Sequence, residues 1–331
     1  MIRRLRERRS DLLALTAQRA AISPLIVVAV TAAAFALAAV SPLDPLAAYL
    51  GDNVQFAGAQ TRDAAAQALG VDAPWWQAWW HWIIGAASGD AGLSHTYRQP
   101  VLDVVAERLP WTVGLSVTGL LLALATAILV GLVAARRPGG WADRALAGVA
   151  VVLSAVPTFV AALAAAAIFA VGLRWLPVAG GWEAGQDPTA GSVARHLILP
   201  AVVLAASQLP WMALVVRQSV LAAHDSLPVR QARARGLPRR TVLSGHIAPV
   251  SWTPLIALVG ARLPEVIVGA LVVEEVFAWP GLAAATVDAA LGADLVMLAA
   301  VSALTAAAIV AGTWLADCAL LLADPRVTVD A

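Results

Sequence analysis

Residues 111–135 read WTVGLSVTGLLLALATAILVGLVAA, a stretch without a single charged side chain. About 20 helical residues cover the roughly 30 Å hydrocarbon core of a bilayer, so this stretch is long enough to cross it. Further apolar segments of comparable length lie near residues 20–40, 145–172, 196–223, 250–278 and 295–322. The sequence therefore predicts an all-α fold, a polytopic membrane helical bundle with six transmembrane helices.

The composition agrees with a membrane protein and excludes other classes. Of 331 residues, 60% are apolar and 13% are charged, whereas soluble domains are about half apolar and a quarter charged. A soluble enzyme is therefore excluded. The net charge is +1, which disfavours a strongly basic nucleic-acid binder. A single cysteine, Cys318, excludes an internal disulfide.

The positions of the arginines predict the topology. Arg3, Arg4 and Arg6 precede the first apolar segment, which is longer than the apolar region of a signal peptide, so we expect an uncleaved anchor. Most arginines lie at or near one face if both termini are cytoplasmic, as the positive-inside rule requires. We expect a multi-pass protein of the cell membrane. It would begin with a cytoplasmic N-terminal segment (1–19), an anchor helix (20–40) and an extracytoplasmic segment between helices 1 and 2 (41–110). A core with five transmembrane helices (111–322), which contains a cytoplasmic loop (about 224–248), and a cytoplasmic tail (323–331) would follow.

The outer segment contains a group of tryptophans at the spacing of one helical face. Its members are Trp75, Trp76, Trp79, Trp80 and Trp82. One interpretation is a helix lying on the outer leaflet, with its indoles at headgroup depth. The other is a docking surface for an extracytoplasmic partner formed by Trp75, Trp76, Trp79 and Trp80. The two interpretations are compatible.

The cytoplasmic loop contains LPVRQARARGLPRR at residues 227–240. Pro228 can open a helix, Gly236 can close it and Pro238 prevents its continuation, so we expect about two helical turns outside the bilayer. The small residues Ala232 and Ala234 would let another protein approach the backbone. The alternative is a loop whose arginines contact lipid phosphates.

Ionisable residues at membrane depth cost about 2.5 to 3.5 kcal/mol on insertion scales, so each needs a partner or a wet surface. Arg262 and Glu265 are three residues apart on one helical face, which allows an ion pair facing the bundle interior. They are either a structural pair or part of the translocation path. Glu274 is expected near the outer mouth, and Asp317 is expected to pair with a basic inner residue.

Catalytic and metal-binding patterns are missing from the sequence. The histidines are scattered, and no pair has the spacing of metal ligands. The Gly-x-Ser-x-Gly elbow of hydrolases and the His-Glu-x-x-His helix of zinc proteases are both absent. We expect no catalytic residue and no metal site in this chain.

Several motifs together resemble one known family. Residues 231–236, QARARG, followed eighteen residues after the glycine by Pro254, resemble the EAA loop of ATP-binding-cassette (ABC) importer permeases. The dipeptide, oligopeptide and nickel branch of binding-protein-dependent permeases is most similar, and within it the B-type subunit of dipeptide and oligopeptide permeases. Further matches are GDAGLS at 89–94, VPTF at 156–159, WLPV at 175–178, EEVFAWPG at 274–281 and DPR at 324–326. Arg262 and Glu265 depart from the family, which is mostly apolar or amide-bearing there.

The resemblance implies the type I ABC importer permease fold and a set of partners. These would be a second homologous permease subunit completing a heterodimeric pore, two cytoplasmic ATPase subunits or domains that bind ATP and Mg²⁺, and an extracytoplasmic substrate-binding protein. The chain itself would bind no cofactor and would be no enzyme. Coupling to the ATPase would fall to Arg230, Gln231, Ala232, Arg233, Ala234, Arg235, Gly236, Leu237, Arg239 and Arg240.

The cargo that the resemblance implies is a di- or oligopeptide. Nickel, glutathione or another small solute is the alternative within the same machinery. A secondary transporter driven by an ion gradient is the alternative from another class. It is disfavoured because no sequence repeat relates two halves and because a carrier needs no capped inner helix.

Overall fold

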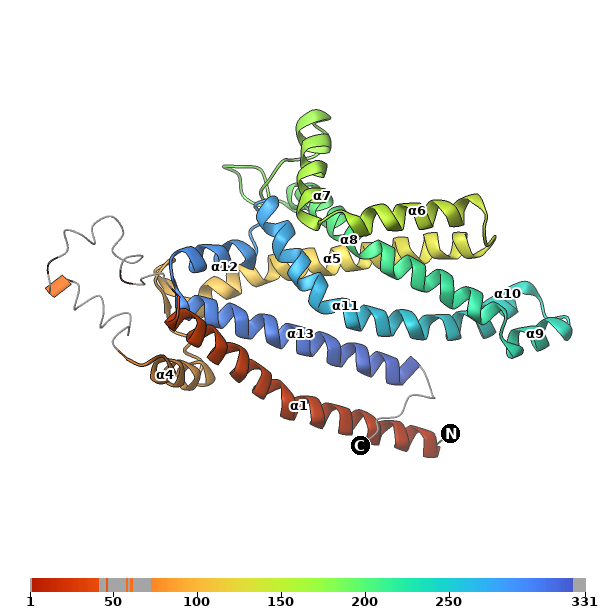
Figure 1. Cartoon of the computed structure of the whole chain (residues 1–331), viewed down its shortest axis with the longest axis horizontal. Helices are drawn as coiled ribbons and strands as arrows, with labels where there is room; N and C mark the ends of the chain where they lie inside the picture. The colour runs from red at the N-terminus through yellow and green to blue at the C-terminus, as the bar shows by residue number, and fades with distance from the viewer. Residues whose placement is uncertain (1, 42–45, 47–57, 59, 62–72, 324–331) are drawn as a thin grey trace. The chain divides into compact units, whose positions relative to one another are not determined.

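The computed structural model describes residues 2–41, 46, 58, 60, 61 and 73–323. It is almost entirely helical (Figure 1), with one two-stranded antiparallel ribbon. Most of the predicted outer segment before residue 73, with Arg62, and the tail from residue 324, with Arg326, lie outside the described residues. The elements are α1 (Ile2–Ala39), α4 (Trp75–Ala87), β1 (Leu93–Ser94), β2 (Gln99–Pro100), α5 (Val101–Ala135), α6 (Trp141–Ala155), α7 (Thr158–Ala165), the π-helix η2 (Ala166–Gly172), α8 (Ala190–His224), α9 (Leu227–Ala234), α10 (Arg239–Val242), the π-helix η3 (Leu243–Ile247), α11 (Ala248–Val276), α12 (Leu282–Leu291) and α13 (Leu295–Ala323).

The candidate membrane spans agree with the predicted bundle. Among the described residues, five helices are long and apolar enough to cross a bilayer, and a bent pair of helices makes a sixth. The first helix starts well before residue 20, and its span begins at Ser10. Helix α5 starts at Val101 and continues through Pro110, so the predicted span 111–135 is the later part of a longer helix. The polytopic all-α prediction is confirmed.

The third predicted span, 145–172, is not one continuous helix. Helix α6 ends at Ala155, and the following helix leaves at an angle of 102°. Val156 has extended backbone angles (φ −91°, ψ 118°), because a residue before proline is disfavoured in the helical region. Pro157 also lacks the N–H that would continue the hydrogen-bond ladder. The predicted span is therefore interrupted by a sharp bend, and it counts as a sixth span only as a bent pair of helices.

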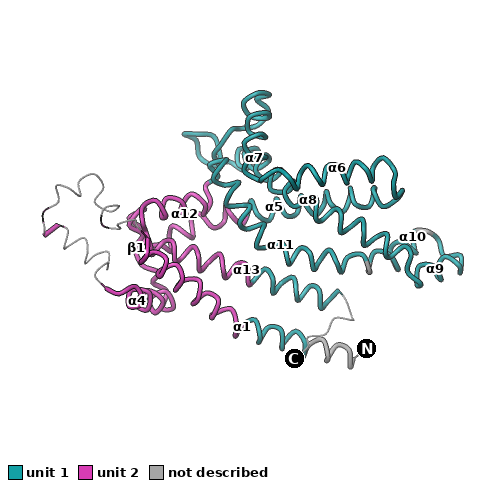
Figure 2. Tube along the Cα trace, in the orientation of Figure 1, with its two compact units in different colours: residues 1–19, 114–279, 311–331 teal, residues 20–113, 280–310 magenta. Residues whose placement is uncertain are grey.

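The chain forms two compact units, shown in different colours in Figure 2. Unit 1 comprises residues 1–19, 114–279 and 311–331, and unit 2 comprises residues 20–113 and 280–310. Unit 1 contains α9 and the loop that the sequence predicts to be cytoplasmic, and unit 2 contains the tryptophan-rich helix α4.

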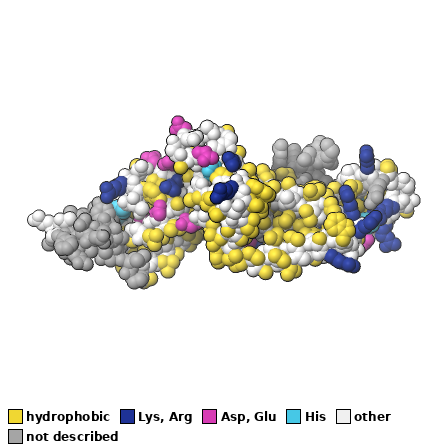
Figure 3. Space-filling view, turned by 90° about the horizontal axis from the view of Figure 1, so that it is seen from above, with side chains coloured by type: hydrophobic (Ala, Val, Ile, Leu, Met, Phe, Trp, Pro, Cys, Tyr) yellow, Lys and Arg dark blue, Asp and Glu magenta, His cyan; other side chains and the backbone are white. Residues whose placement is uncertain are grey.

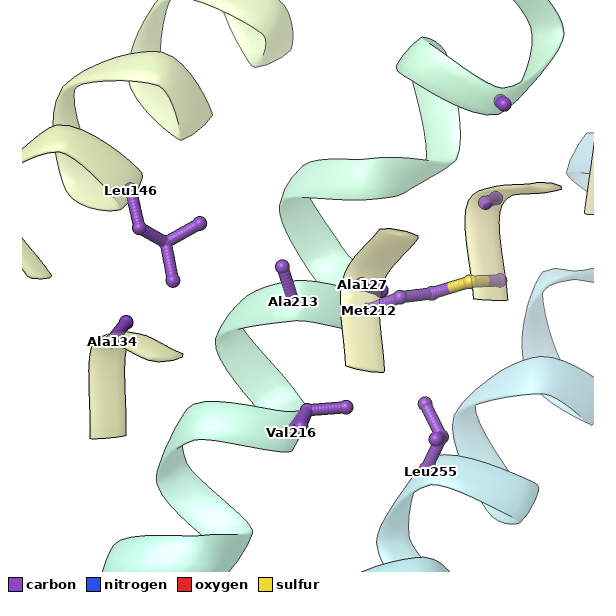
Figure 4. Packing of buried hydrophobic residues seen from close by; sticks show 9 residues of the cluster. Ala127, Ala134, Leu146, Met212, Ala213, Val216 and Leu255 are labelled. Atoms are coloured by element: carbon purple, nitrogen blue, oxygen red, sulfur yellow. The ribbon is translucent and has the colours of Figure 1, made fainter. Parts of the chain in front are cut away.

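The core of unit 1 is built from small residues on α5 and α8. Figure 4 shows Ala127 and Ala134 of α5 beside Ala213 and Met212 of α8, with Val216 facing Leu255 of α11. Small side chains at helix contacts allow the close backbone approach on which packing in membranes depends. The remaining members of this buried cluster are Ala123, Leu146 and Ala205.

An ion pair connects α6 to α8 in the same unit. Arg217 makes a two-pronged contact with Asp143, and its Nη2 lies 2.7 Å from Oδ2 of the carboxylate. The Gly139 N–H donates to the same carboxylate at 2.8 Å. The side chains of Arg217 and Asp143 are only 19% and 10% exposed. A pairing with this bidentate geometry fixes the orientation of two helices as well as satisfying both charges.

Unit 2 has its own core around the ribbon and α12. Val101, Val104, Ala285, Ala289 and Met297 are buried there. Asp294, which is fully buried, accepts hydrogen bonds from Ser94 Oγ at 2.6 Å and from the backbone N–H groups of Thr96 and Met297 at 3.1 Å. The bond from Met297 caps the start of α13 in the manner of an N-terminal aspartate. Asp294 therefore ties the ribbon to the beginning of the last span.

Tyr97 reinforces the same region of unit 2. Its hydroxyl donates to Asp288 Oδ2 at 2.6 Å, and the guanidinium of Arg108 lies 4.9 Å from the centre of its ring. Burial and then the hydrogen bond to Asp288 raise the pKa of Tyr97 to about 12. The phenol therefore stays protonated, and remains a hydrogen-bond donor, even in moderately alkaline solution.

The close contact of α5 with α8 generates a stability prediction. A Cβ atom at Gly131 would lie 2.8 Å from the backbone oxygen of Ala213, whereas Gly114 on the same helix faces open space. We expect Gly131→Ala to destabilise the protein by about 1 to 3 kcal/mol, because the backbone of α5 or α8 must move to make room for the new methyl group. Gly114→Ala should leave stability unchanged or slightly raised. Thermal unfolding of both variants in detergent measures the difference, and equal midpoints would contradict the packing described.

Candidate coupling helix and membrane-embedded charges

The predicted inner helix is present as α9, directly attached to the long span α8. Only Asp225 and Ser226 separate the two helices. Ser226 Oγ donates to the carbonyl of Ala223 at 2.6 Å, and the Arg230 N–H donates to the carbonyl of Ser226 at 3.1 Å. Pro228 lies in the first turn, where its missing N–H costs nothing. A two-residue turn bonded on both sides leaves little freedom between α8 and α9.

The end of α9 is a glycine stop of the Schellman type. Gly236 has a left-handed backbone with φ +74°. Its N–H donates to the carbonyl of Arg233 at 2.9 Å, and the N–H of Leu237 donates to the carbonyl of Ala232 at 3.2 Å. These are the two bonds that define this motif. The predicted stop at Gly236 is therefore confirmed.

The inner face of α9 is apolar and completely packed. Val229 is 0% exposed and Ala232 is 3% exposed. They lie in one cluster with Ala223 of α8, Val242 of α10 and Ile247 of η3. We call this group the α9 anchor. Ala232 therefore packs against the chain's own helices, and Ala234 is the small residue of this helix that is exposed.

The outer face of α9 is polar and basic. Exposed side chains include Arg230, Gln231, Arg233 and Ala234, followed by Arg235, Leu237 and Arg240. Arginine side chains gather at the end of unit 1 that carries α9 and α10 (Figure 3). The side chain of Arg239 lies outside those described. Arg233 in the last turn also interacts favourably with the helix dipole.

The segment after α9 continues into a span without a break. Helix α10 begins at Arg239, η3 follows at Leu243, and α11 begins at Ala248. Val242 and Ile247 of this segment are members of the α9 anchor. Helix α9 is therefore attached to the end of α8 and to the beginning of α11. A force on its outer face reaches two long helices at once.

Arg262 and Glu265 of α11 form the predicted ion pair. Arg262 contacts the carboxylate of Glu265. The guanidinium carbon of Arg262 also lies 4.3 Å from the ring centre of Trp211 on α8, a cation–π arrangement. The side chain of Arg262 is 17% exposed, whereas that of Glu265 is 57% exposed. Arg262 is thus held between two partners, and the Glu265 carboxylate is open to a third group.

Glu274 and Asp317 lie in different surroundings. Glu274 is 1% exposed, close to the buried side chains of Phe277 and Trp279 in the sequence, whereas its neighbour Glu275 is exposed. Glu274 therefore does not lie at an open mouth of this chain. Asp317 of α13 pairs with Arg19 of α1, as the sequence predicted for a basic inner partner.

The tryptophans of α4 divide between two faces. Trp79 donates through Nε1 to Thr31 Oγ1 of α1 at 3.1 Å, and Trp82 packs on Phe35 with ring centres 5.9 Å apart. Trp76 and Trp80 are 55% and 56% exposed. Trp75 is half-buried and takes part in neither of these contacts. Of the predicted docking residues, Trp76 and Trp80 are the ones that present a free surface.

Sequence reasoning missed three polar features of the structure. The Asp143–Arg217 pair and the stacking of Trp211 on Arg262 join residues far apart in the chain, so no local pattern indicates them. Asp294 had a local signal, because an aspartate directly before an apolar helical run is a typical helix N-cap. Among the described residues, no group of three metal-ligating side chains lies together.

Comparisons with known proteins agree with this arrangement. Residues 127–329 match the family described as binding-protein-dependent transport system inner membrane component, and residues 12–116 match the N-terminal family of the same membrane components. An oligopeptide transport system permease protein of Bacillus subtilis is 28% identical over 91% of this chain and 95% of its own length.

Two further relatives extend the comparison to other cargoes. A putative peptide transport system permease protein of Brucella abortus is 32% identical over 94% of this chain and 96% of its own length. A glutathione transport system permease protein of Escherichia coli is 32% identical over 75% of this chain and 76% of its own length. With its spans, its capped inner helix and a family match over most of its length, the chain belongs to the inner membrane components of binding-protein-dependent transport systems.

Proposed function

We propose that this chain is one of two permease subunits of an ATP-driven importer that takes up di- or oligopeptides. The peptide is delivered by an extracytoplasmic binding protein, and a pair of cytoplasmic ATPase subunits or domains binds ATP and Mg²⁺. The second permease subunit is a homologue that completes the pore. This chain supplies neither an ATPase site nor a cofactor. The observation that carries the proposal is α9, a short helix that is fixed on one face and exposed and basic on the other.

Helix α9 has the properties that a mechanical connection needs. Its inner face is buried, its beginning is a two-residue turn and its end is a Schellman stop. Its outer arginines suit a groove with acidic side chains on the ATPase. When the ATPases close on ATP, a rigid-body movement of α9 would carry the ends of α8 and α11 with it. We infer that this movement switches the pore between its inward and outward openings.

The orientation that we propose places both termini and α9 in the cytoplasm. Within unit 1, the first turns of α1, the last turns of α13 and helix α9 lie toward the same end (Figure 1). Arg136 and Arg137, which follow α5, are exposed. These positions support the positive-inside rule as applied to the sequence. The segment with α4 is then extracytoplasmic, where Trp76 and Trp80 are available to the binding protein or the outer leaflet.

Peptides are the cargo that the relatives support best, since an oligopeptide permease and a peptide permease match more than 90% of the chain. A glutathione permease matches 75% of it, which favours this small peptide-like solute as the second candidate. Nickel has no supporting observation here. Family membership also leaves the gradient-driven carrier without support, because the family is binding-protein-dependent.

The ion pair on α11 is our candidate for the translocation path. A carboxylate that is 57% exposed within a span cannot face hydrocarbon without a cost of some kcal/mol. Glu265 must therefore meet water or another polar group in the assembled transporter. Its negative charge matches the ammonium end of a peptide. Glu274 lies on the same helix but is buried. We propose that it borders the translocation path only in another conformation of the transporter.

The energy source is tested by uptake into proteoliposomes containing the complete transporter. We expect peptide uptake that requires both internal ATP and added binding protein, because the family works with such a protein. A proton or sodium gradient without ATP should drive no uptake above the empty-vesicle control. Uptake driven by the gradient alone, or uptake of equal rate without binding protein, would contradict the proposal.

Coupling is tested by Gly236→Val. Valine is strongly disfavoured at the left-handed φ of +74°, with a cost of roughly 1 to 2 kcal/mol, so the Schellman stop should be lost. We expect ATP hydrolysis to continue while uptake falls about tenfold, at an unchanged level in the membrane. Gly245→Val is the matched control, because Gly245 lies in η3 without a positive φ and also faces open space. Undiminished uptake by Gly236→Val would remove the assigned role of α9.

The role of Glu265 is tested by Glu265→Gln. If its carboxylate meets the ammonium group of the cargo, uptake of a peptide with a free amino terminus should fall several-fold. Uptake of the same peptide with an acetylated amino terminus, which has no ammonium group for Glu265 to bind, should change little. Glu275→Gln removes an exposed carboxylate from the same helix and serves as the control. A purely structural pair predicts instead that both peptides lose the same fraction of uptake.

A further inference from the structure

A cavity lies beside the α9 anchor in unit 1. It has a volume of about 140 Å³, and its lining is almost entirely apolar. Helices α5 and α8 form one wall, and η3 with the start of α11 forms the other. The residues that define this inner cavity include Ile128 and Leu132 of α5, Val216 and Val220 of α8, and Ile247 and Leu255 of the opposite wall.

The chemistry of the lining selects the kind of molecule that fits. Apolar cavities of about 150 Å³ stay free of water and take up apolar ligands. Ser251 lines the cavity, but its Oγ already donates to the carbonyl of Ile247 at 2.9 Å. Apart from this hydroxyl and the indole N–H of Trp252, the lining is apolar. A hydrocarbon chain is the occupant that these walls accept.

The cavity is open on the side where its lining residues are exposed at the surface of the helices. Leu132, Leu243 and Trp252, which all line it, are 37%, 50% and 42% exposed. A hydrocarbon chain could therefore enter from the bilayer without unfolding any helix. Trp252 adds an indole, a side chain that is common at headgroup depth in membrane proteins.

Arginines follow or precede the cavity lining by only a few residues on α5 and on the segment from α10 to η3. Leu132 and Ile128 precede Arg136 by four and eight residues, which corresponds to about 6 and 12 Å along a helix. On the opposite wall, Arg240 precedes Leu243 by three residues, the spacing of neighbours on one helical face. Arg136, Arg137 and Arg240 are exposed, and within the described part of the chain their side chains form no ion pair. By this spacing, we expect positive charge near the position that a lipid phosphate would take.

We propose that the inner cavity binds one acyl chain of an anionic phospholipid, with its phosphate near Arg240 and Arg136. The site is amphipathic, as the lipid is. Its apolar cavity matches the acyl chain, and its exposed guanidinium groups match the phosphate. Ile247 and Val220 connect it to the α9 anchor, because Ile247 is a member of that cluster and Val220 packs against it. The site is thus part of the joint that holds α9.

The test uses the full chain in nanodiscs and two photoactivatable lipids with the same diazirine-bearing acyl chain. One is phosphatidylglycerol and the other is phosphatidylcholine. We expect phosphatidylglycerol to label residues 243–255, and we expect Ala248→Leu, which fills the cavity, to reduce this labelling about tenfold. Ala147→Leu places the same side chain at an exposed position of α6 and should change nothing. Labelling that is equal in both variants would overturn the proposal.

The headgroup is tested by Arg240→Gln. One arginine near the surface contributes about 1 kcal/mol to the attraction of an anionic lipid, which corresponds to a fivefold preference. Arg240→Gln should therefore reduce the ratio of phosphatidylglycerol to phosphatidylcholine labelling about fivefold. An unchanged ratio would contradict the phosphate site. Loss of all labelling on assembly with the ATPase and second permease would show a protein occupant instead. Neither readout depends on transport, so failure here is distinct from failure of the proposed coupling.

Discussion

The contact between the buried face of α9 and the ends of two long helices is the interaction on which the rest of the account depends. Helix α9 has eight residues, far fewer than the 12 to 15 at which isolated helices become even marginally stable. It is held instead by Val229 and Ala232, packed against Ala223, Val242 and Ile247. Complete burial of one valine is worth about 1.5 to 3 kcal/mol, so the anchor compensates for the short length. A helix held in this way transmits a push, whereas a flexible loop would absorb it.

Much of this arrangement follows from local sequence signals. Apolar length indicates the spans, and Pro228, Gly236 and Pro238 bracket α9 because each acts on the backbone at its own position. The pairing of Arg262 with Glu265 depends only on helical spacing. The sequence could not indicate which way Ala232 faces, because alanine fits both a buried contact and an exposed one. Trp211 beneath Arg262 and Asp143 beside Arg217 required the packing of α8 to be known. The bend at Pro157 was hidden by apolar residues on both sides.

The charged residues within or beside the spans fall into two groups. Asp143 with Arg217, and Arg19 with Asp317, are pairs whose charges satisfy each other and connect helices. Arg262 and Glu265 differ, because the arginine is held by Trp211 while the carboxylate stays accessible. The inner cavity is the opposite case, an apolar surface that no residue of the described part of the chain fills. Polar and apolar openings thus occur at separate places, which fits one surface for cargo and another for lipid.

The most direct measurement is photo-cross-linking of α9 in the assembled transporter. In a Cys318→Ala background, single cysteines replace Arg233, on the exposed face of α9, and Arg144, an exposed arginine on α6. Each cysteine carries a short benzophenone label. We predict that the label at position 233 cross-links to an ATPase subunit, with a yield that changes on ATP binding, while the label at position 144 does so much less. Absence of any cross-link from position 233, in a complex that still contains both ATPases, would contradict the central claim.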